Sequence, residues 1–123
     1  MMDWMEEFPA AITVCDRRGK VLAMNRAAGR VFGASGGRRL IGKSLLDCHP
    51  GPARALLEAM LVQPRLHTYT IQKGRVKKLI HQSPWYQRGR FAGYVELSLV
   101  LPRKLPHHVR SAVSSARGPR RGS

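Results

Sequence analysis

Residues 66–101 constrain the fold most strongly, because apolar and polar side chains alternate there with a period of two. The alternation predicts strands at Leu66–Lys73, Val76–Trp85 and Phe91–Leu101. Only the turns at Gly74 and Arg88–Gly89 separate them, and such short connections join antiparallel neighbours. Pro84 interrupts the middle strand and predicts a bulge or a sheet edge, since proline has no backbone N–H to donate. We therefore expect a three-stranded antiparallel meander.

The residues before this meander predict a hairpin followed by helices. Residues 11–16 and 20–25 flank Gly19 in the manner of a hairpin, and Asn25 is a good N-cap for a short helix. The clearest helix covers Pro52–Val62, with proline in its first turn. Its apolar residues recur at the spacing of one buried stripe: Ala53, Leu56, Leu57, Met60 and Leu61. Strands and helices in this order predict an α+β fold with an antiparallel sheet.

The last predicted strand has one apolar side. Phe91 and the odd-numbered residues 95–101 are apolar, whereas Tyr94, Glu96 and Ser98 fall between them. Because successive side chains of a strand point to opposite faces, we expect the apolar set to form the core face. Tyr94 is then expected to point outward, together with Thr68 and Thr70 of the first strand of the meander.

The chain has 123 residues and a formal net charge of +15, which is enough length for one domain with one packed core. We expect a lead helix over residues 1–7, a domain over residues 8–102, and a basic, disordered tail over residues 103–123. The tail contains no acid, and its basic residues are Arg103, Lys104, Arg110, Arg117, Arg120 and Arg121. A basic surface attracts nucleic acid, anionic lipid or acidic proteins without specifying which. Basic and aromatic residues are not interleaved, so we expect any nucleic-acid binding to be weak and non-specific.

Several classes of protein are disfavoured by composition. No segment approaches the ~20 apolar residues of a membrane-spanning helix, and we expect no secretory leader. Two cysteines, Cys15 and Cys48, make no disulfide framework, which favours a reducing, cytoplasmic setting. The sequence has no Ser–His–Asp order, paired carboxylates or HExxH helix, and only seven acids in all. We therefore expect a protein that is not an enzyme.

Cys48-His49-Pro50, preceded by Asp47, is the segment with the most chemical potential. A thiol and an imidazole stand side by side at a helix start, where a thiol can be reactive and an imidazole can bind a metal or haem iron. The alternative is that Cys48 packs in the core while Asp47 or His49 caps the following helix.

A small, largely apolar pocket is expected between the helix Pro52–Val62 and the sheet. The helix supplies an apolar wall, the strands supply imidazole and aromatic groups, and His49 is the principal polar or iron-coordinating contact. Apolar walls with few polar groups are typical of small-molecule sites, although cross-strand packing would use the same residues. The residues expected to line the pocket are Cys48, His49, Leu56, Met60, His67, Tyr69, His81 and Trp85.

The order of these segments resembles the PAS family across residues 8–102. The resemblance is carried by Ala11–Asp16, Gly19, Asn25–Ala28, Phe32-Gly33, Leu40–Ser44 and Gly93–Leu97. The segment Asp47–Pro50 looks like that of small bacterial PAS proteins with a Cys-His-Pro sequence. The resemblance implies a five-stranded antiparallel sheet with short helices packed on one face, a role in ligand sensing or protein interaction, and frequent dimerisation.

Two departures from the family bear on which cofactor the chain could bind. Haem-binding PAS domains commonly have a histidine on the long helix, and Pro52–Val62 has none. The Asn-Cys-Arg-Phe-Leu segment of flavin-binding light sensors is also absent. The cofactor is therefore left open, with haem as a lesser option.

We expect a cytoplasmic PAS-type sensor that binds a small ligand or a signalling protein and transmits occupancy through altered protein contacts, as a homodimer. One alternative is a haem- or metal-dependent redox sensor centred on Cys48 and His49. The other is a basic nucleic-acid-binding protein.

Overall fold

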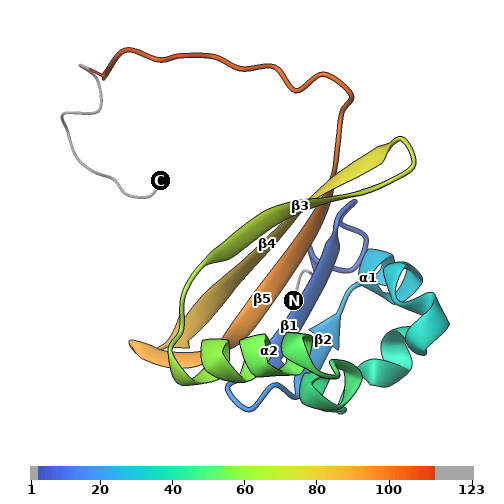
Figure 1. Cartoon of the computed structure of the whole chain (residues 1–123), viewed down its shortest axis with the longest axis vertical. Helices are drawn as coiled ribbons and strands as arrows, with labels where there is room; N and C mark the ends of the chain where they lie inside the picture. Colours follow the sequence, from blue (N-terminus) through green and yellow to red (C-terminus); the bar gives the residue numbers. More distant parts are fainter. Residues whose placement is uncertain (1–2, 113–123) are drawn as a thin grey trace.

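The structure is a computed structural model that describes residues 3–112. Its strands and helices are β1 (Ala11–Asp16), β2 (Val21–Met24), α1 (Arg26–Val31), α2 (Pro52–Val62), β3 (His67–Lys73), β4 (Val76–Gln87) and β5 (Arg90–Leu101) (Figure 1). The 3-10 helices η1 (Gly33–Ser35), η2 (Gly37–Leu40) and η3 (Leu45–Cys48) connect α1 to α2. The first two residues of the predicted lead and residues 113–123 of the predicted tail lie outside the described residues.

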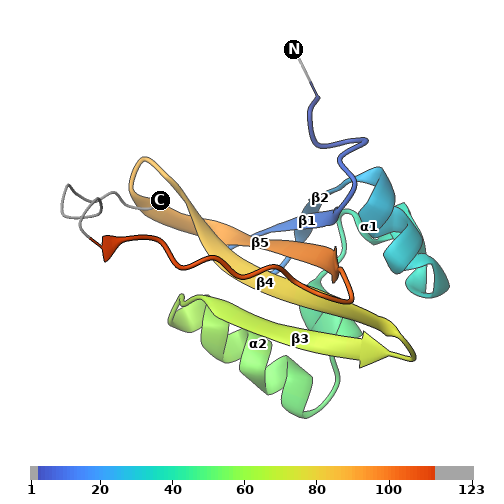
Figure 2. The same ribbon diagram turned by 90° about the horizontal axis from the view of Figure 1, so that it is seen from above.

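The strands form a five-stranded antiparallel sheet in the order β2-β1-β5-β4-β3, and Figure 2 shows β2 and β3 at its edges. The predicted meander is present, and its strand bounds differ from the prediction by one or two residues. β1 returns to the middle of the sheet and pairs with β5 from Ala11↔Ser98 to Asp16↔Gly93. Both α-helices lie on one side of this sheet (Figure 1). The predicted α+β class, with short helices on one face of the sheet, is confirmed.

Pro84 lies where both predicted features occur. The β3–β4 pairing begins at His67↔Gln82, so the part of β4 that contains Pro84 has only β5 as a neighbour. The register with β5 shifts one residue further on, between Trp85 and Tyr86. The missing N–H of proline therefore interrupts no hydrogen bond to β3.

Asn25 joins three parts of the chain and is 1% exposed. Its Oδ1 accepts hydrogen bonds from the backbone N–H groups of Ile12 (2.9 Å) and Ala28 (3.0 Å), and the second of these caps α1 as predicted. Its Nδ2 donates to the carbonyl oxygens of Ala10 (2.8 Å) and Met5 (2.9 Å). One side chain thus fixes the start of α1 against β1 and against the segment before it.

That preceding segment forms a turn over residues 4–7, where we had predicted a helix. The carbonyl oxygen of Glu6 accepts from the N–H of Arg26 at 3.1 Å, and its carboxylate pairs with Arg38. These contacts hold the turn against the start of α1 with no need for helical hydrogen bonds.

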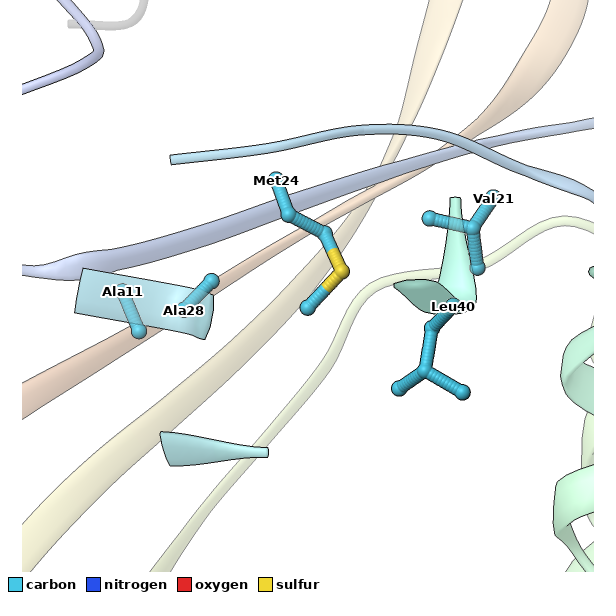
Figure 3. Packing of buried hydrophobic residues seen from close by; sticks show 5 residues of the cluster. All are labelled: Ala11, Val21, Met24, Ala28 and Leu40. Atoms are coloured by element: carbon cyan, nitrogen blue, oxygen red, sulfur yellow. The ribbon is translucent and has the colours of Figure 1, made fainter. Parts of the chain in front are cut away.

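A small hydrophobic core lies beneath α1. Ala11, Val21, Met24, Ala28 and Leu40 pack together there, and each is at most 8% exposed (Figure 3). A second buried cluster joins Cys15 of β1, Met60 of α2 and Tyr94 of β5. The space between these two clusters is where the candidate site lies.

The prediction for β5 was wrong about which face meets the helices. Tyr94, Glu96 and Ser98 point toward the helices, so the odd-numbered residues Val95, Leu97 and Leu99 lie on the opposite face. Tyr94, expected to point outward, is 6% exposed. The apolar side of β5 therefore contributes to an apolar outer sheet face, which we define by Ile12, Val14, Leu79, His81, Val95, Leu97 and Leu99.

The helix α2 has the predicted bounds and a different rotation about its axis. Met60 is its buried residue, Leu57 and Leu61 are half-buried, and Ala53 and Leu56 are exposed. The stripe that faces the sheet is thus narrower than the sequence pattern indicated. No helix within residues 3–112 has the length and apolar character needed to cross a bilayer.

Candidate ligand-binding site

A cavity of about 380 Å³ lies between the sheet and the helical side of the molecule. Voids in packed protein interiors rarely exceed the size of a water molecule, so a space this large is not a packing defect. Its sheet side is formed by Thr13, Cys15, Val21, Met24, Tyr69, Ile71, Lys78, Ile80, Gln82, Tyr94, Glu96 and Ser98. Its helical side is formed by Val31, Phe32, Ser35, Leu40, Leu45, His49, Leu57 and Met60.

Tyr94 fixes the wall that α2 contributes. Its hydroxyl donates to the carbonyl oxygen of Met60 at 2.7 Å and accepts from the N–H of Arg65 at 3.0 Å. The ring packs edge-on against Phe91, with 5.6 Å between the centroids. Because the C-terminal carbonyls of a helix lack partners within the helix, this hydroxyl stabilises the last turn of α2.

Cys15 lies at the same wall and is buried. Burial raises the pKa of its thiol, a backbone hydrogen bond from Tyr94 acts in the opposite direction, and the charges of Asp16 and Glu96 raise it further. The side chain therefore remains an uncharged thiol and behaves as a small apolar group.

His49 reaches the cavity from the end of η3. Its Nδ1 lies 2.6 Å from the carbonyl oxygen of Leu45. Since a carbonyl can only accept, Nδ1 carries the proton, and in the neutral ring Nε2 is then an acceptor. Asp47, two residues before His49, is exposed, and its carboxylate lies 3.9 Å from a guanidinium nitrogen of Arg54. The side chain of the neighbouring Cys48 lies outside what the structure describes.

A chain of polar side chains crosses the sheet at one end of the cavity. The Nδ1 of His67 lies 2.9 Å from Oε1 of Gln82, and Nε2 of Gln82 donates to Oε1 of Glu96 at 2.8 Å. Beside it, partial burial and then the charge of Glu96 raise the pKa of Tyr69, which keeps the phenol protonated. The otherwise apolar wall thus carries a carboxylate, an amide and a phenol.

The structure brings only some of the predicted site residues together. His49, Met60 and Tyr69 line the cavity, and His67 stacks on Tyr69 at 4.8 Å without lining it. Leu56 faces away from the cavity and is 40% exposed, while the adjacent Leu57 takes the place predicted for it.

His81 and Trp85 also lie elsewhere. His81 belongs to the outer sheet face, where its Nδ1 lies 2.8 Å from the hydroxyl of Thr68. The indole of Trp85 donates to the carbonyl oxygen of Cys15 at 3.0 Å and lines a separate, shallower hollow. The sequence predicts that His81 and Trp85 lie on the strand next to His67 and Tyr69. It does not indicate to which side of the sheet each side chain points.

The sequence-based prediction missed most of the lining residues, among them Cys15, Gln82, Tyr94 and Glu96. Of these, Tyr94 and Glu96 lie on the side of β5 that was predicted to face away from the core. The sequence did contain a signal for these residues, because the register of the meander places polar side chains of β4 and β5 next to one another. A strand face that is polar in its centre and covered by apolar helices suits a cavity wall.

The hollow beside Trp85 is cationic. Its lining includes Arg17 and Arg18 of the β1–β2 turn and Arg90 of β5, together with Asp16. The carboxylate of Asp16 is already engaged, since its Oδ1 accepts from the N–H groups of Arg18 and Lys20. This end of the sheet thus concentrates part of the basic charge of the chain.

The residues around the cavity do not fit a haem. His49 offers an imidazole with a held Nδ1, as a haem ligand would. The cavity is near the lower limit of the ~300–1,000 Å³ typical of small-molecule sites, which leaves little space for a porphyrin. The carboxylate of Glu96 would also lie at the wall that the macrocycle must contact. Among the side chains that the structure describes, which do not include Cys48, no group of three or more His, Cys, Asp or Glu is arranged to hold a metal ion.

Comparison with known proteins places this geometry in a family. The model of the PAS fold matches residues 5–101. The comparison with curated proteins returned no match.

Solved structures share the fold at low sequence identity. The PAS domain of BvgS from Bordetella pertussis has a TM-score of 0.59 at 22% identity, over 80% of this chain and 81% of that chain. A C-terminal domain from Streptococcus mutans has a TM-score of 0.64 at 17% identity, over 78% of each chain. The Aer2 receptor from Vibrio cholerae, described as a dual PAS-haem oxygen sensor, has a TM-score of 0.57 at 16% identity, over 76% of this chain and 95% of that chain. With its sheet order, its helices on one face and a family match over most of its length, this chain belongs to the PAS family.

Proposed function

We propose that this sensory PAS domain binds a small ligand in the cavity between α2 and the sheet and transmits its occupancy through α2. PAS domains are generally sensory rather than catalytic, and this general role follows from membership of the family. The observation that supports the finer proposal is the 380 Å³ cavity with polar groups on one part of an apolar wall.

The way α2 is attached suits transmission. Met60 is the buried residue of this helix, and the Tyr94 hydroxyl holds its carbonyl oxygen. Both residues line the cavity, so a ligand that contacts either one alters the attachment of the helix. A ligand shifts such an equilibrium only through different affinities for the two arrangements, and contact with this attachment supplies that difference.

The exposed surface of α2 is a suitable output for a signalling partner. Leu56 and Val62 are 40% and 84% exposed, and both are on this helix. A partner that contacts them would sense a displacement of the helix directly. The partner itself is another protein chain of the signalling pathway.

Self-association is the second contact that we propose, through the outer sheet face. The centre of this face has apolar side chains and one imidazole, and Lys77 lies on the same face only near the start of β4. Two copies of a chain with a net charge of +15 repel one another, so a face with an uncharged centre is suited to meet its own copy in a two-fold arrangement.

A cavity-filling substitution tests the ligand site. Leu57→Trp places a larger side chain into the cavity from α2, whereas Leu56→Trp adds the same group on the exposed side of the helix. The probe is phenylbutanol, an apolar molecule with a neutral head, titrated by calorimetry. We expect Leu57→Trp to abolish binding and Leu56→Trp to retain it. Equal binding by both variants, or none by the wild type, would contradict the proposal.

A further inference from the structure

The cavity contains one carboxylate, and that carboxylate has no cationic partner. Glu96 is the only acidic residue of the lining. Gln82 donates to one of its oxygens, and no ion pair with Lys, Arg or His is formed by Glu96 within the described residues 3–112. The acids that do form ion pairs in this part of the chain are Glu6, Asp47 and Glu58, and none of them lines the cavity.

Glu96 is confined to the cavity by its position in the sheet. It lies in β5, between Thr13 of β1 and Gln82 of β4, and has a strand on each side. It is half-buried, so its charge is only partly hydrated. A carboxylate in such a place needs hydrogen bonds or an opposite charge, because burial disfavours an unpaired ion.

The basic residues that line the cavity, Lys78 and His49, form no ion pair with this carboxylate. Lys78 pairs with Ile71 and Val100, four residues along β4 from Gln82. Four residues of a strand span about 13 Å, which separates the two charges to different parts of the wall. Lys78 is also the third residue of β4 after the β3–β4 turn, so its long side chain can place the ammonium in water. His49 is held by the carbonyl oxygen of Leu45 instead.

The groups around the cavity favour a ligand with a positive charge over a ligand with a negative charge. The hydroxyl of Tyr69 and the thiol of Cys15 remain protonated, as argued above, so neither competes as an anion. Phe32, Tyr69 and Tyr94 add aromatic rings to the lining, and ring faces attract cations. The remaining lining is mostly aliphatic and suits an apolar body.

We propose that the ligand is a small molecule with one cationic nitrogen group, an amine or amidine, that pairs with Glu96, and with an apolar body that contacts the helical side of the cavity. This inference rests on the proposed function, since it assigns a chemical class to the ligand of the same cavity. The expected contact is a charge-assisted hydrogen bond to the carboxylate oxygen that Gln82 leaves free.

Three probes with one body and different heads test the assignment. They are phenylbutylamine, phenylbutanol and phenylbutyrate, which present a cationic, a neutral and an anionic head. The positive charge of the whole chain favours the anion, so long-range attraction alone predicts the opposite order from ours. We expect the amine to bind about tenfold more tightly than the alcohol, and the butyrate to bind most weakly.

The variant Glu96→Gln removes the charge and keeps the shape and the oxygen that accepts from Gln82. The preference for the amine over the alcohol should then fall to about twofold or less, with alcohol binding unchanged. Glu58→Gln is the matched control, because it removes one negative charge from the exposed face of α2 and should leave the preference intact.

The possible outcomes are separable by calorimetry. If the alcohol binds wild type as tightly as the amine does, the cationic assignment is overturned and the cavity proposal stands. The same conclusion follows if Glu96→Gln retains the preference for the amine. Failure of all three probes to bind wild type overturns the cavity proposal and the assignment together. The wild-type order of the three heads decides the question even where Glu96→Gln is poorly folded.

Discussion

The hydroxyl of Tyr94 donates to the carbonyl oxygen of Met60 across 2.7 Å and thereby ties the last turn of α2 to the centre of the sheet. The oxygen of the Tyr94 hydroxyl also accepts a hydrogen bond from the N–H of Arg65. One side chain therefore fixes both the end of the helix and the segment that leads to β3. Most other contacts of α2 are made by exposed or half-buried side chains. The attachment of this helix therefore depends on this hydroxyl and on the packing of Met60 against Cys15 and Tyr94.

Removal of that hydroxyl should loosen α2 more than it destabilises the sheet. We expect Tyr94→Phe to lower the free energy of unfolding by about 1–2 kcal/mol, because a carbonyl and an N–H lose their partner. Hydrogen exchange should accelerate in α2 and at Arg65, while β1 and β5 keep their protection. The control is Tyr86→Phe, whose ring is exposed and whose change should have little effect on either measurement. Uniform acceleration across the sheet would contradict a local role.

Gly93 is required by the pairing of β1 with β5. Its φ is +143°, and a Cβ built on it would lie 1.9 Å from the carbonyl oxygen of Cys15. We expect Gly93→Ala to cost about 3 kcal/mol in chemical denaturation, since the backbone of β1 must move. Gly33→Ala is the matched control, because nothing lies within 4 Å of the added carbon there. A Gly93→Ala protein as stable as the control would show that β1 and β5 are not packed as described.

Asn25 should be among the least replaceable residues of the domain. Asn25→Ala leaves buried donors and acceptors of Ile12, Ala28 and Ala10 without partners, and we expect a loss of about 3 kcal/mol in urea unfolding. Asn25→Asp keeps the accepting oxygen and replaces the donor to Ala10 by a second acceptor. The Asn25→Asp variant should therefore be destabilised as well. If it is as stable as the wild type, the hydrogen bonds donated by the amide nitrogen do not contribute to stability as proposed.

A charge placed on the outer sheet face should separate the two copies of the proposed dimer. Leu97 lies in the middle of that face, on β5 opposite His81 of β4. We expect Leu97→Arg to sediment as a monomer where the wild type sediments as a dimer, because two like charges would meet across the two-fold axis. Val62→Arg adds the same charge on exposed α2 and should leave the dimer intact. A wild type that is monomeric at high concentration would contradict the proposal.

The strands could be predicted because the alternation along β3, β4 and β5 survives in the folded chain. The face that meets the helices could not, since a period of two separates the two sides of β5 without saying which one is covered. Here the covered side holds a cavity, so it tolerates Glu96 and Ser98, while the apolar Leu97 and Leu99 lie on the other face. The sequence therefore suggested the reverse assignment.

The same limit explains the exchange of Leu56 for Leu57 in the candidate site. Both fall within an apolar stripe at helical spacing, and the rotation of α2 is decided by the contact of Met60 with Cys15 and Tyr94. His49 could be predicted because it ends the segment that leads into α2. Glu96 could not, because a charged residue in an alternating strand ordinarily faces water.

The central claim is that the space between α2 and the sheet is a ligand site, and nuclear magnetic resonance of side-chain methyl groups tests it most directly. With phenylbutylamine added to the wild-type chain, we expect the methyl signals of Met60, Ile71 and Ile80 to shift, since all three residues line the cavity. The methyl signals of Leu105 and Val109, which are 63% and 87% exposed and lie outside α2, should stay in place. Shifts confined to the outer sheet face, or no shift at Met60 at any probe concentration, would contradict the account.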